Sequence, residues 1–234
     1  MNRSALQHDQ AIPAVEFLAH AAVRLIASDG TKLVIDPYKS GGFDGKMGYS
    51  PIEEPADLVW STHDHADHCA LDEVPDNPMI LETPGDYGPF SLSTWTLAHD
   101  EYGGRRRGGM VEVTRIEVDG RVIVHLSDVG QAVPGRIPSA FRRPDVLLAT
   151  CGGYYTIGAA QAWEWSMRIA ARVTIPIHYK TDQCELPIRT RENFEKHWRQ
   201  VRREAGDRIE LGRELFSFHR DAVPMRQKHG ASAR

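Results

Sequence analysis

The first half of the chain consists mainly of short apolar or alternating runs separated by turn-forming residues, which is the pattern of β-strands. Asp119-Gly120 is a strong two-residue hairpin signal between two of these runs. A segment rich in glycine and proline, residues 36–55, carries the aromatic residues Tyr38, Phe43 and Tyr49 and is expected to form an ordered loop that could overhang a site. We predict strands at residues 15–18, 23–26, 32–35, 58–60, 79–82, 91–97, 110–118 and 121–126.

The second half mixes strands with helices. Apolar side chains recur at helical spacing between residues 159 and 170, which predicts a helix there. Thr190 is a suitable N-cap for another helix, which the apolar stripe Phe194, Trp198 and Val201 extends to about residue 203. Further strands are predicted at residues 145–149, 173–177, 208–211 and 214–218.

Length and composition fit one globular domain. The 234 residues are 41% hydrophobic, which is enough to bury a sizeable core. We expect a flexible N-terminus at residues 1–12, a single domain at 13–220 and a flexible, polar tail at 221–234. No run of about 18 apolar residues occurs, so no membrane span is expected.

Charge and cysteine content narrow the range of partners. The 28 basic and 32 acidic residues give a net charge of -4, which offers no general attraction for nucleic acid or anionic membranes. Three widely spaced cysteines, Cys69, Cys151 and Cys184, indicate neither a disulfide framework nor a cysteine zinc site. The N-terminal segment also lacks the apolar core of a signal peptide. We expect a cytoplasmic protein that acts on a small molecule, and the sequence leaves open whether it forms a homo-oligomer.

The strongest chemical signal is the string THDHADH at residues 62–68. Its imidazoles and carboxylates are ligands that zinc, manganese and iron accept. The apolar run at residues 58–60 predicts a buried strand that ends just before the string. We therefore expect a metal site at the C-terminal end of this strand, with the candidate ligands His63, His65, Asp67 and His68.

Three further histidine or aspartate residues follow predicted strands, as the string does. These residues are His99, Asp128 and His178. Together with the string they provide seven ligands, enough for two adjacent cations that each keep an exchangeable water.

The order HxHxDH, followed by a histidine, an aspartate and a histidine, resembles the ligand order of the metallo-β-lactamase superfamily. The strings HDEYGGRRRG (99–108), VHLSDVG (124–130), GGYYTIG (152–158) and IPIHYKT (175–181) resemble a simple prokaryotic branch that includes ascorbate-6-phosphate lactonase relatives. The resemblance implies an α/β fold, a four-layer αββα sandwich, with the site along one edge between the two sheets.

The resemblance also assigns roles to individual residues. It implies one metal held by His63, His65 and His99, a second held by Asp67, His68 and His178, and a bridge between them at Asp128. Asp36 matches a family aspartate near the site, and we expect it to orient a ligand histidine. Two zinc ions are the first expectation, with manganese or iron as alternatives.

These assignments imply a metal-dependent hydrolase in which a dinuclear centre activates hydroxide. The hydroxide would attack a small, anionic ester, lactone, amide or phosphodiester, with Asp67 and Asp128 as catalytic residues. Cationic and hydroxyl side chains near the ligands would bind the substrate, and the candidates are Arg105, Arg106, Arg107, Tyr154, Tyr179 and Lys180.

Two other functions fit the same residues, a di-iron redox protein and a non-catalytic metal-binding module. The redox function needs an electron donor, and a flavin domain does not fit in this length. The complete ligand set disfavours the non-catalytic module. Residues expected to lie outside the direct chemistry are Cys69, His20, His125, His197 and His219.

Overall fold

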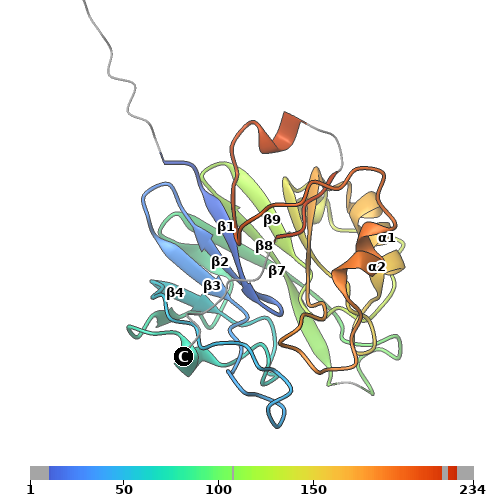
Figure 1. The fold of residues 1–234 in the computed structure, drawn as a ribbon. Coiled ribbons are helices and arrows are strands. Elements are labelled where there is room, and N and C mark those ends of the chain that lie inside the picture. The colour runs from blue at the N-terminus through green and yellow to red at the C-terminus, as the bar shows by residue number, and fades with distance from the viewer. Residues whose placement is uncertain (1–10, 107, 218–220, 226–234) are drawn as a thin grey trace, which may run out of the picture.

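The chain folds into two β-sheets that pack face to face (Figure 1). The structure is a computed structural model and describes residues 11–106, 108–217 and 221–225. The first sheet has six strands in the order β12-β1-β2-β3-β4-β5. Their bounds are β1 (Ala14–Ala19), β2 (Ala22–Ile26), β3 (Lys32–Ile35), β4 (Leu58–Trp60), β5 (Met79–Ile80) and β12 (Arg208–Glu210).

The second sheet has seven strands in the order β13-β11-β10-β9-β8-β7-β6. It comprises β6 (Gly85–Tyr87), β7 (Phe90–Ala98), β8 (Met110–Val118), β9 (Arg121–His125), β10 (Val146–Thr150), β11 (Val173–Ile177) and β13 (Asp221–Ala222). Hairpin β8–β9 turns at Asp119-Gly120, where both residues have positive φ, as a tight two-residue turn requires.

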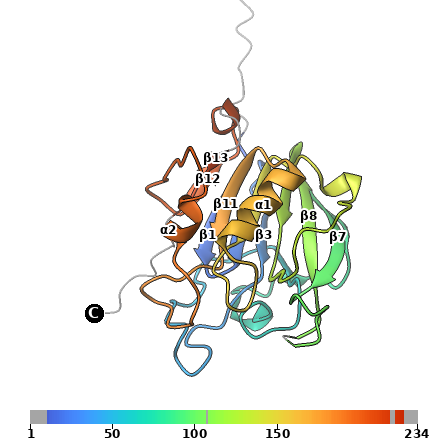
Figure 2. The same cartoon turned by 90° about the vertical axis from the view of Figure 1, so that its right-hand side faces the viewer.

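Helices cover the outer face of the second sheet. Figure 2 shows α1 (Ala159–Ile169) lying across this sheet in front of its strands, with α2 (Arg191–Glu195) beside it. Trp165 of α1 is fully buried against the main core. Three short 3-10 helices, η1 (Leu71–Glu73), η2 (Ser139–Phe141) and η3 (Leu215–Ser217), complete the described elements. The predicted αββα type of sandwich is thus confirmed.

Because side chains alternate between the two faces of a strand, the first sheet packs against apolar side chains on both of its faces. In β3, Leu33 and Ile35 belong to the core between the sheets, whereas Val34 points to the opposite face. On that face Val34 joins a second apolar cluster that includes Met47 and Tyr49 from the loop between β3 and β4. This loop therefore covers the outer face of the first sheet, and it lies at the bottom of Figure 1.

Strand direction gathers several strand ends at one edge. β1 and β3 are both antiparallel to β2, and β4 is parallel to β3, so these three strands run the same way. In the second sheet β7, β9, β10 and β11 likewise share one direction. Residues that follow the C-terminal ends of these strands can therefore meet.

The helix predicted for residues 190–203 is wrong beyond Glu195. Val201 instead forms a parallel bridge with Ala222, and the Arg202 backbone N–H donates to the Ala222 carbonyl at 2.9 Å. This backbone pairing draws the segment into extended chain and overrides its helical periodicity of apolar residues.

Two more predictions about the C-terminal part need correction. The strand predicted for residues 214–218 is a 3-10 helix, η3, whose Leu215 and Phe216 turn into the core; Phe218 lies outside the described residues. Residues 221–225 pair and pack with the domain rather than starting a tail, because Val223 and Met225 are buried. Residues 1–10 and 226–234, where most of the predicted flexible termini fall, lie outside the described part of the chain.

Within the described ranges, no helix is both long and apolar enough to cross a membrane.

Candidate metal centre and active site

Each candidate ligand follows the C-terminal end of a strand. The string 62–68 follows β4, and His99 follows β7. Asp128 follows β9 after two residues, and His178 directly follows β11. Within each sheet the strands that carry these residues share one direction, and the structure brings their side chains together at one edge of the sandwich.

Four non-glycine residues at this edge have a left-handed backbone. The φ angles are 55° at His20, 53° at Asp36, 55° at Ser127 and 50° at His178. Such conformations cost on the order of 1–3 kcal/mol each and persist only where the surrounding structure holds them, often at functional sites. Four of the strained backbone positions thus lie where the candidate ligands are positioned.

The first group of donors consists of His63, His65 and His99, each with one ligand nitrogen within 4.8 Å of the others. His63 Nε2 lies 3.1 Å from His65 Nδ1. This distance is close to the roughly 3.3 Å between two nitrogen ligands of a tetrahedral zinc ion. Gly108 packs against the group, because a Cβ there would lie only 2.2 Å from His65 Nε2.

The second group consists of His20, Asp67, His68 and His178, all of them buried, with ligand atoms again within 4.8 Å of one another. His20 Nε2 lies 3.1 Å from Asp67 Oδ2, and His68 Nε2 lies 3.6 Å from the same oxygen. The rings of His20 and His178 are 4.0 Å apart between centroids. The structure therefore adds His20 to three residues that the sequence predicts as one set.

Asp128 lies between the two groups. Its Oδ1 is 3.2 Å from His68 Nε2 and 3.4 Å from His178 Nε2. Its Oδ2 is 3.4 Å from His99 Nε2. One carboxylate oxygen thus faces each donor group, which is the arrangement that a bridging ligand requires.

Asp36 supports the site from behind. The Thr62 backbone N–H donates to its Oδ1 at 2.8 Å, and the Thr62 hydroxyl donates to its Oδ2 at 2.8 Å. His68 Nδ1 lies 2.9 Å from the same Oδ2. This contact leaves His68 Nε2 to face Asp67 and Asp128, as is usual when a carboxylate orients a metal-binding histidine.

Burial and neighbouring charge set the protonation of the donors. Burial lowers the pKa of His63 and His178 to about 3, so both rings are neutral at ordinary pH. Burial also disfavours the charged form of His68, but Asp128, Asp67 and Asp36 outweigh it and raise the His68 pKa well above its usual range. For Asp67, burial opposes ionisation, but His68 and the His20 hydrogen bond hold its pKa below the ordinary value.

The donor atoms fit a divalent cation. His68 Nε2, His99 Nε2 and Asp128 Oδ1 face the space between the donor groups, are buried and make no hydrogen bond among the described residues. Each such atom costs about 1–3 kcal/mol when it remains unsatisfied. Imidazole and carboxylate groups that converge in this way are the donor set that zinc, manganese and iron accept.

A cavity of about 500 Å³ opens over the two donor groups. On the donor side it is lined by His65, Ala66, Asp67, His99 and Asp128. On the other side its walls come from three loops, which contribute the apolar or aromatic side chains Phe43, Tyr154, Tyr155 and Leu186. A substrate in this cavity would therefore contact the donor groups directly.

The chain is similar to a known protein family and to solved structures. Residues 14–178 match the family described as the beta-lactamase superfamily domain. A Thermotoga maritima structure, assigned as a Zn-dependent hydrolase of the metallo-β-lactamase superfamily, is 26% identical with a TM-score of 0.70. The similarity covers 92% of this chain and 100% of that one. The chain belongs to the metallo-β-lactamase superfamily.

Two relatives within the superfamily extend the comparison. A UPF0173 metal-dependent hydrolase from Archaeoglobus fulgidus is 28% identical over 196 residues, which is 71% of this chain and 83% of the relative. Another from Methanospirillum hungatei is 31% identical over 199 residues, with 71% and 83% of the two chains covered. The relatives of this metallo-β-lactamase superfamily member are thus metal-dependent hydrolases by name.

Two of the side chains predicted to bind substrate in this superfamily member lie elsewhere. Tyr154 lines the cavity as predicted for a substrate-binding residue, but the prediction that Tyr179 binds substrate is wrong. The Tyr179 side chain packs in the core, and its hydroxyl donates to the Met225 carbonyl at 3.2 Å. Lys180 lines a separate hollow together with Asp182.

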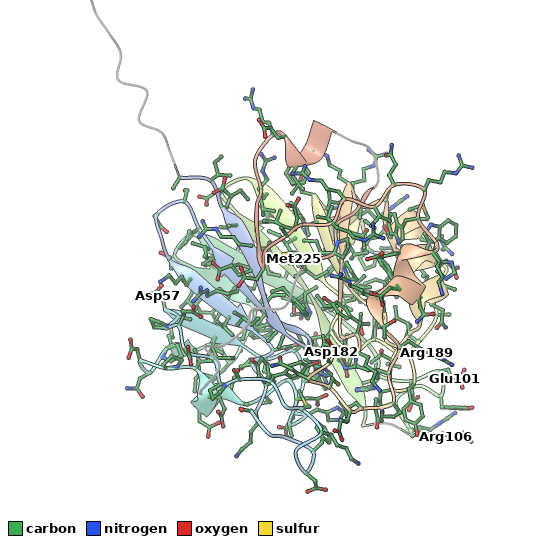
Figure 3. The ribbon with its side chains drawn as sticks, in the orientation of Figure 1. Asp57, Glu101, Arg106, Asp182, Arg189 and Met225 are labelled. Carbon is green, nitrogen blue, oxygen red and sulfur yellow. The ribbon has the colours of Figure 1, made fainter. Side chains whose placement is uncertain are left out.

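The predicted arginine cluster is likewise not part of the described cavity wall. Arg105 and Arg106 are exposed and do not line the cavity. The Arg106 guanidinium stacks on the Tyr102 ring at 3.8 Å, and Figure 3 shows its side chain at the rim of the molecule. Arg107 lies outside the described residues.

Sequence reasoning did not place His20, Phe43 or Leu186 at the site. His20 directly follows β1, so the strand-end rule that identified His99 could also have identified it. Phe43 was expected only as part of an overhanging loop, and Leu186 carries no local signal. These two reach the cavity through the packing of loops that are distant in sequence.

Proposed function

We propose that the protein is a metal-dependent hydrolase that works with two adjacent divalent cations. The position of Asp128 carries this proposal, since its two oxygens face different donor groups. A shared carboxylate helps to hold two cations at the separation of roughly 3.5–4 Å at which paired ions act on one substrate.

The seven candidate ligands divide between the two cations. We assign His63, His65 and His99 to one cation, Asp67, His68 and His178 to the other, and Asp128 to both. Zinc is the first expectation, because the donors are imidazoles and carboxylates and the Thermotoga maritima protein is assigned as Zn-dependent. Manganese and iron accept the same donors.

The chemistry needs a nucleophile and a way to stabilise negative charge. When bound, the two cations lower the pKa of water and stabilise the charge that develops on the attacked oxygen. Asp67 lies in the cavity wall, and its hydrogen bond with His20 fixes Oδ2. Its carboxylate is therefore placed to orient a water molecule and accept a proton from it.

The carbonyl and phosphoryl compounds that suit this chemistry are esters, lactones, amides and phosphodiesters. The cavity of about 500 Å³ is of the size that usually holds a small molecule, since such sites span about 300–1,000 Å³. We therefore propose a small-molecule substrate from one of these four classes.

Metal titration combined with a substrate panel tests the proposal. Protein stripped with a chelator is titrated with zinc or manganese and then assayed on one compound of each class. We expect two bound equivalents and turnover of at least one class. Two bound equivalents with no turnover across a broad panel would contradict the hydrolase assignment, and native iron with visible absorption would indicate redox chemistry instead.

A further inference from the structure

We infer that the cavity wall opposite the metal donors is a subsite for an uncharged apolar group, so that the substrate carries an aliphatic or aromatic acyl chain next to the cleaved bond. The inference rests on the proposed hydrolase function and specifies its substrate. It is carried by four side chains of that wall, Phe43, Tyr154, Tyr155 and Leu186.

Two of these side chains are unusually exposed for their type. Phe43 is 46% exposed and Tyr154 is 61% exposed, although large apolar surfaces are usually buried. Tyr154 and Tyr155 pack edge to face with ring centroids 4.7 Å apart. Exposed aromatic side chains gathered at one cavity indicate a site that is covered when a ligand binds.

Hydrogen bonds tie the loop that carries Phe43 to the loop that carries Leu186. The Gly48 N–H donates to the Gln183 carbonyl at 2.8 Å, and the Glu185 N–H donates to the Lys46 carbonyl at 2.8 Å. Phe43 itself sits in a compact turn closed by the Gly45 N–H to Gly41 carbonyl bond of 3.0 Å. These two loops are therefore held in place relative to each other.

The loop that carries the two tyrosines is anchored to the metal site itself. The Gly152 N–H donates to the His178 carbonyl at 3.0 Å, and a Cβ at Gly152 would come within 2.3 Å of that oxygen. Gly153 N–H donates to the Ile157 carbonyl at 3.1 Å and closes the loop. The aromatic wall is thus preorganised at a fixed position relative to His178, which reduces the entropy cost of binding.

On the wall opposite the donors, the described side chains that line the cavity carry no charge. Within the described ranges, no lysine or arginine lines the cavity, and its two carboxylates, Asp67 and Asp128, lie on the donor side as proposed metal ligands. Arg106 is stacked on Tyr102, and Lys180 lines a different hollow. A carboxylate or phosphate tail would have to be desolvated against these uncharged side chains, with no described cationic side chain on this wall to pair with it.

A matched series of 4-nitrophenyl esters tests the subsite on the zinc-loaded protein. We expect kcat/KM to rise from the acetate through the butyrate to the hexanoate, by up to about fourfold per methylene while the chain is being buried. The pentanoate should be preferred over the hemisuccinate, which has similar length but ends in a carboxylate. Both comparisons use one leaving group, so they report on the acyl side alone.

Two single substitutions locate the subsite. Phe43→Ala and Tyr154→Ala should flatten the rise with chain length, and both side chains are exposed enough for the fold to tolerate their removal. Met79→Ala is the matched control, because Met79 is 60% exposed on β5 and does not line the cavity. It should keep the wild-type chain-length dependence.

Binding of the neutral dye Nile red to metal-free protein gives a readout that does not need catalysis. We expect the fluorescence increase to fall at least severalfold in Phe43→Ala and Tyr154→Ala and to persist in Met79→Ala. Ester turnover with a flat series or a preference for the hemisuccinate would overturn the subsite while leaving the hydrolase intact. If no ester is turned over, the proposed function fails in this assay, and equal dye binding by all variants would then overturn the subsite separately.

Discussion

His20 Nε2 lies 3.1 Å from Asp67 Oδ2, and both side chains are buried at the edge where β1 ends. The contact joins a histidine outside the predicted ligand order to a proposed metal ligand. A hydrogen bond of this kind fixes the carboxylate before metal binds and removes part of the cost of ordering it.

His20→Ala should therefore weaken binding of the second cation by about 10- to 100-fold, while the first cation binds as before. Competition with a chromophoric chelator measures the two affinities separately. His20→Gln should restore most of the affinity, because its side-chain amide can donate to Asp67. If both variants lose thermal stability but bind two cations as tightly as the wild type, His20 has only a structural role.

Gly108→Ala should disturb the first cation instead. A Cβ at this position would lie 2.2 Å from His65 Nε2, so the ring must shift and change its 3.1 Å contact with His63 Nε2. We expect the affinity of the first site to fall by about 10- to 100-fold, as when other groups that position a ligand are lost. Isothermal titration of metal-stripped protein with zinc measures the loss.

Gly109→Ala is the matched control for that substitution. Gly109 has a φ of 92°, similar in sign and size to the 103° of Gly108, but no atom lies within 4 Å of an added Cβ. Both variants therefore share the backbone strain, and only Gly108→Ala displaces His65. Equal metal affinities in the two variants would show that the close approach to His65 is unimportant.

Much of the fold can be predicted because many of its strands show a recognisable pattern in their own sequence. β2 and β9 are short apolar runs next to turn residues, and the turn at Asp119-Gly120 fixes one hairpin. The end of α2 cannot be predicted in this way. Its sequence favours a longer helix, but the pairing of Val201 with Ala222 depends on a strand that is distant from α2 in sequence.

The candidate site likewise has features that the sequence predicts and features that it does not. His99 and His178 follow strongly apolar strands, so their positions at one edge are predictable. The exclusion of Lys180 from the cavity is not, because it depends on the bridge between Lys180 and Thr190. The cavity walls depend similarly on pairing between loops, such as Gly48 with Gln183, which leaves no periodic pattern in the sequence.

Metal affinity should rise with pH across the neutral range. The pKa of His68 is raised by its three carboxylate neighbours, so the metal-free ring is protonated near neutral pH and must lose that proton to bind metal. His63 and His178 have pKa values of about 3 and are already neutral. Below the His68 pKa, affinity should therefore increase by up to about tenfold per pH unit for each proton displaced.

Calorimetric titration with zinc in two buffers of different ionisation enthalpy counts the protons released. We expect at least one proton per protein near neutral pH, and fewer as the pH rises above the His68 pKa. Affinity that stays constant between about pH 5.5 and 8, with no proton release, would show that His68 is neutral before metal binds.

Asp128→Ala should uncouple the two cations. The carboxylate faces His99 with one oxygen and His68 and His178 with the other, so its loss removes a ligand from both positions. We expect fewer than two bound equivalents and a drop in kcat of at least about 10²- to 10³-fold on whichever substrate is turned over. Asp128→Asn keeps the shape but not the charge, so it should bind metal more weakly than the wild type and better than Asp128→Ala. Full activity in Asp128→Ala would contradict the two-cation mechanism, since no other described carboxylate lies within ion-pair distance of both His99 and His178.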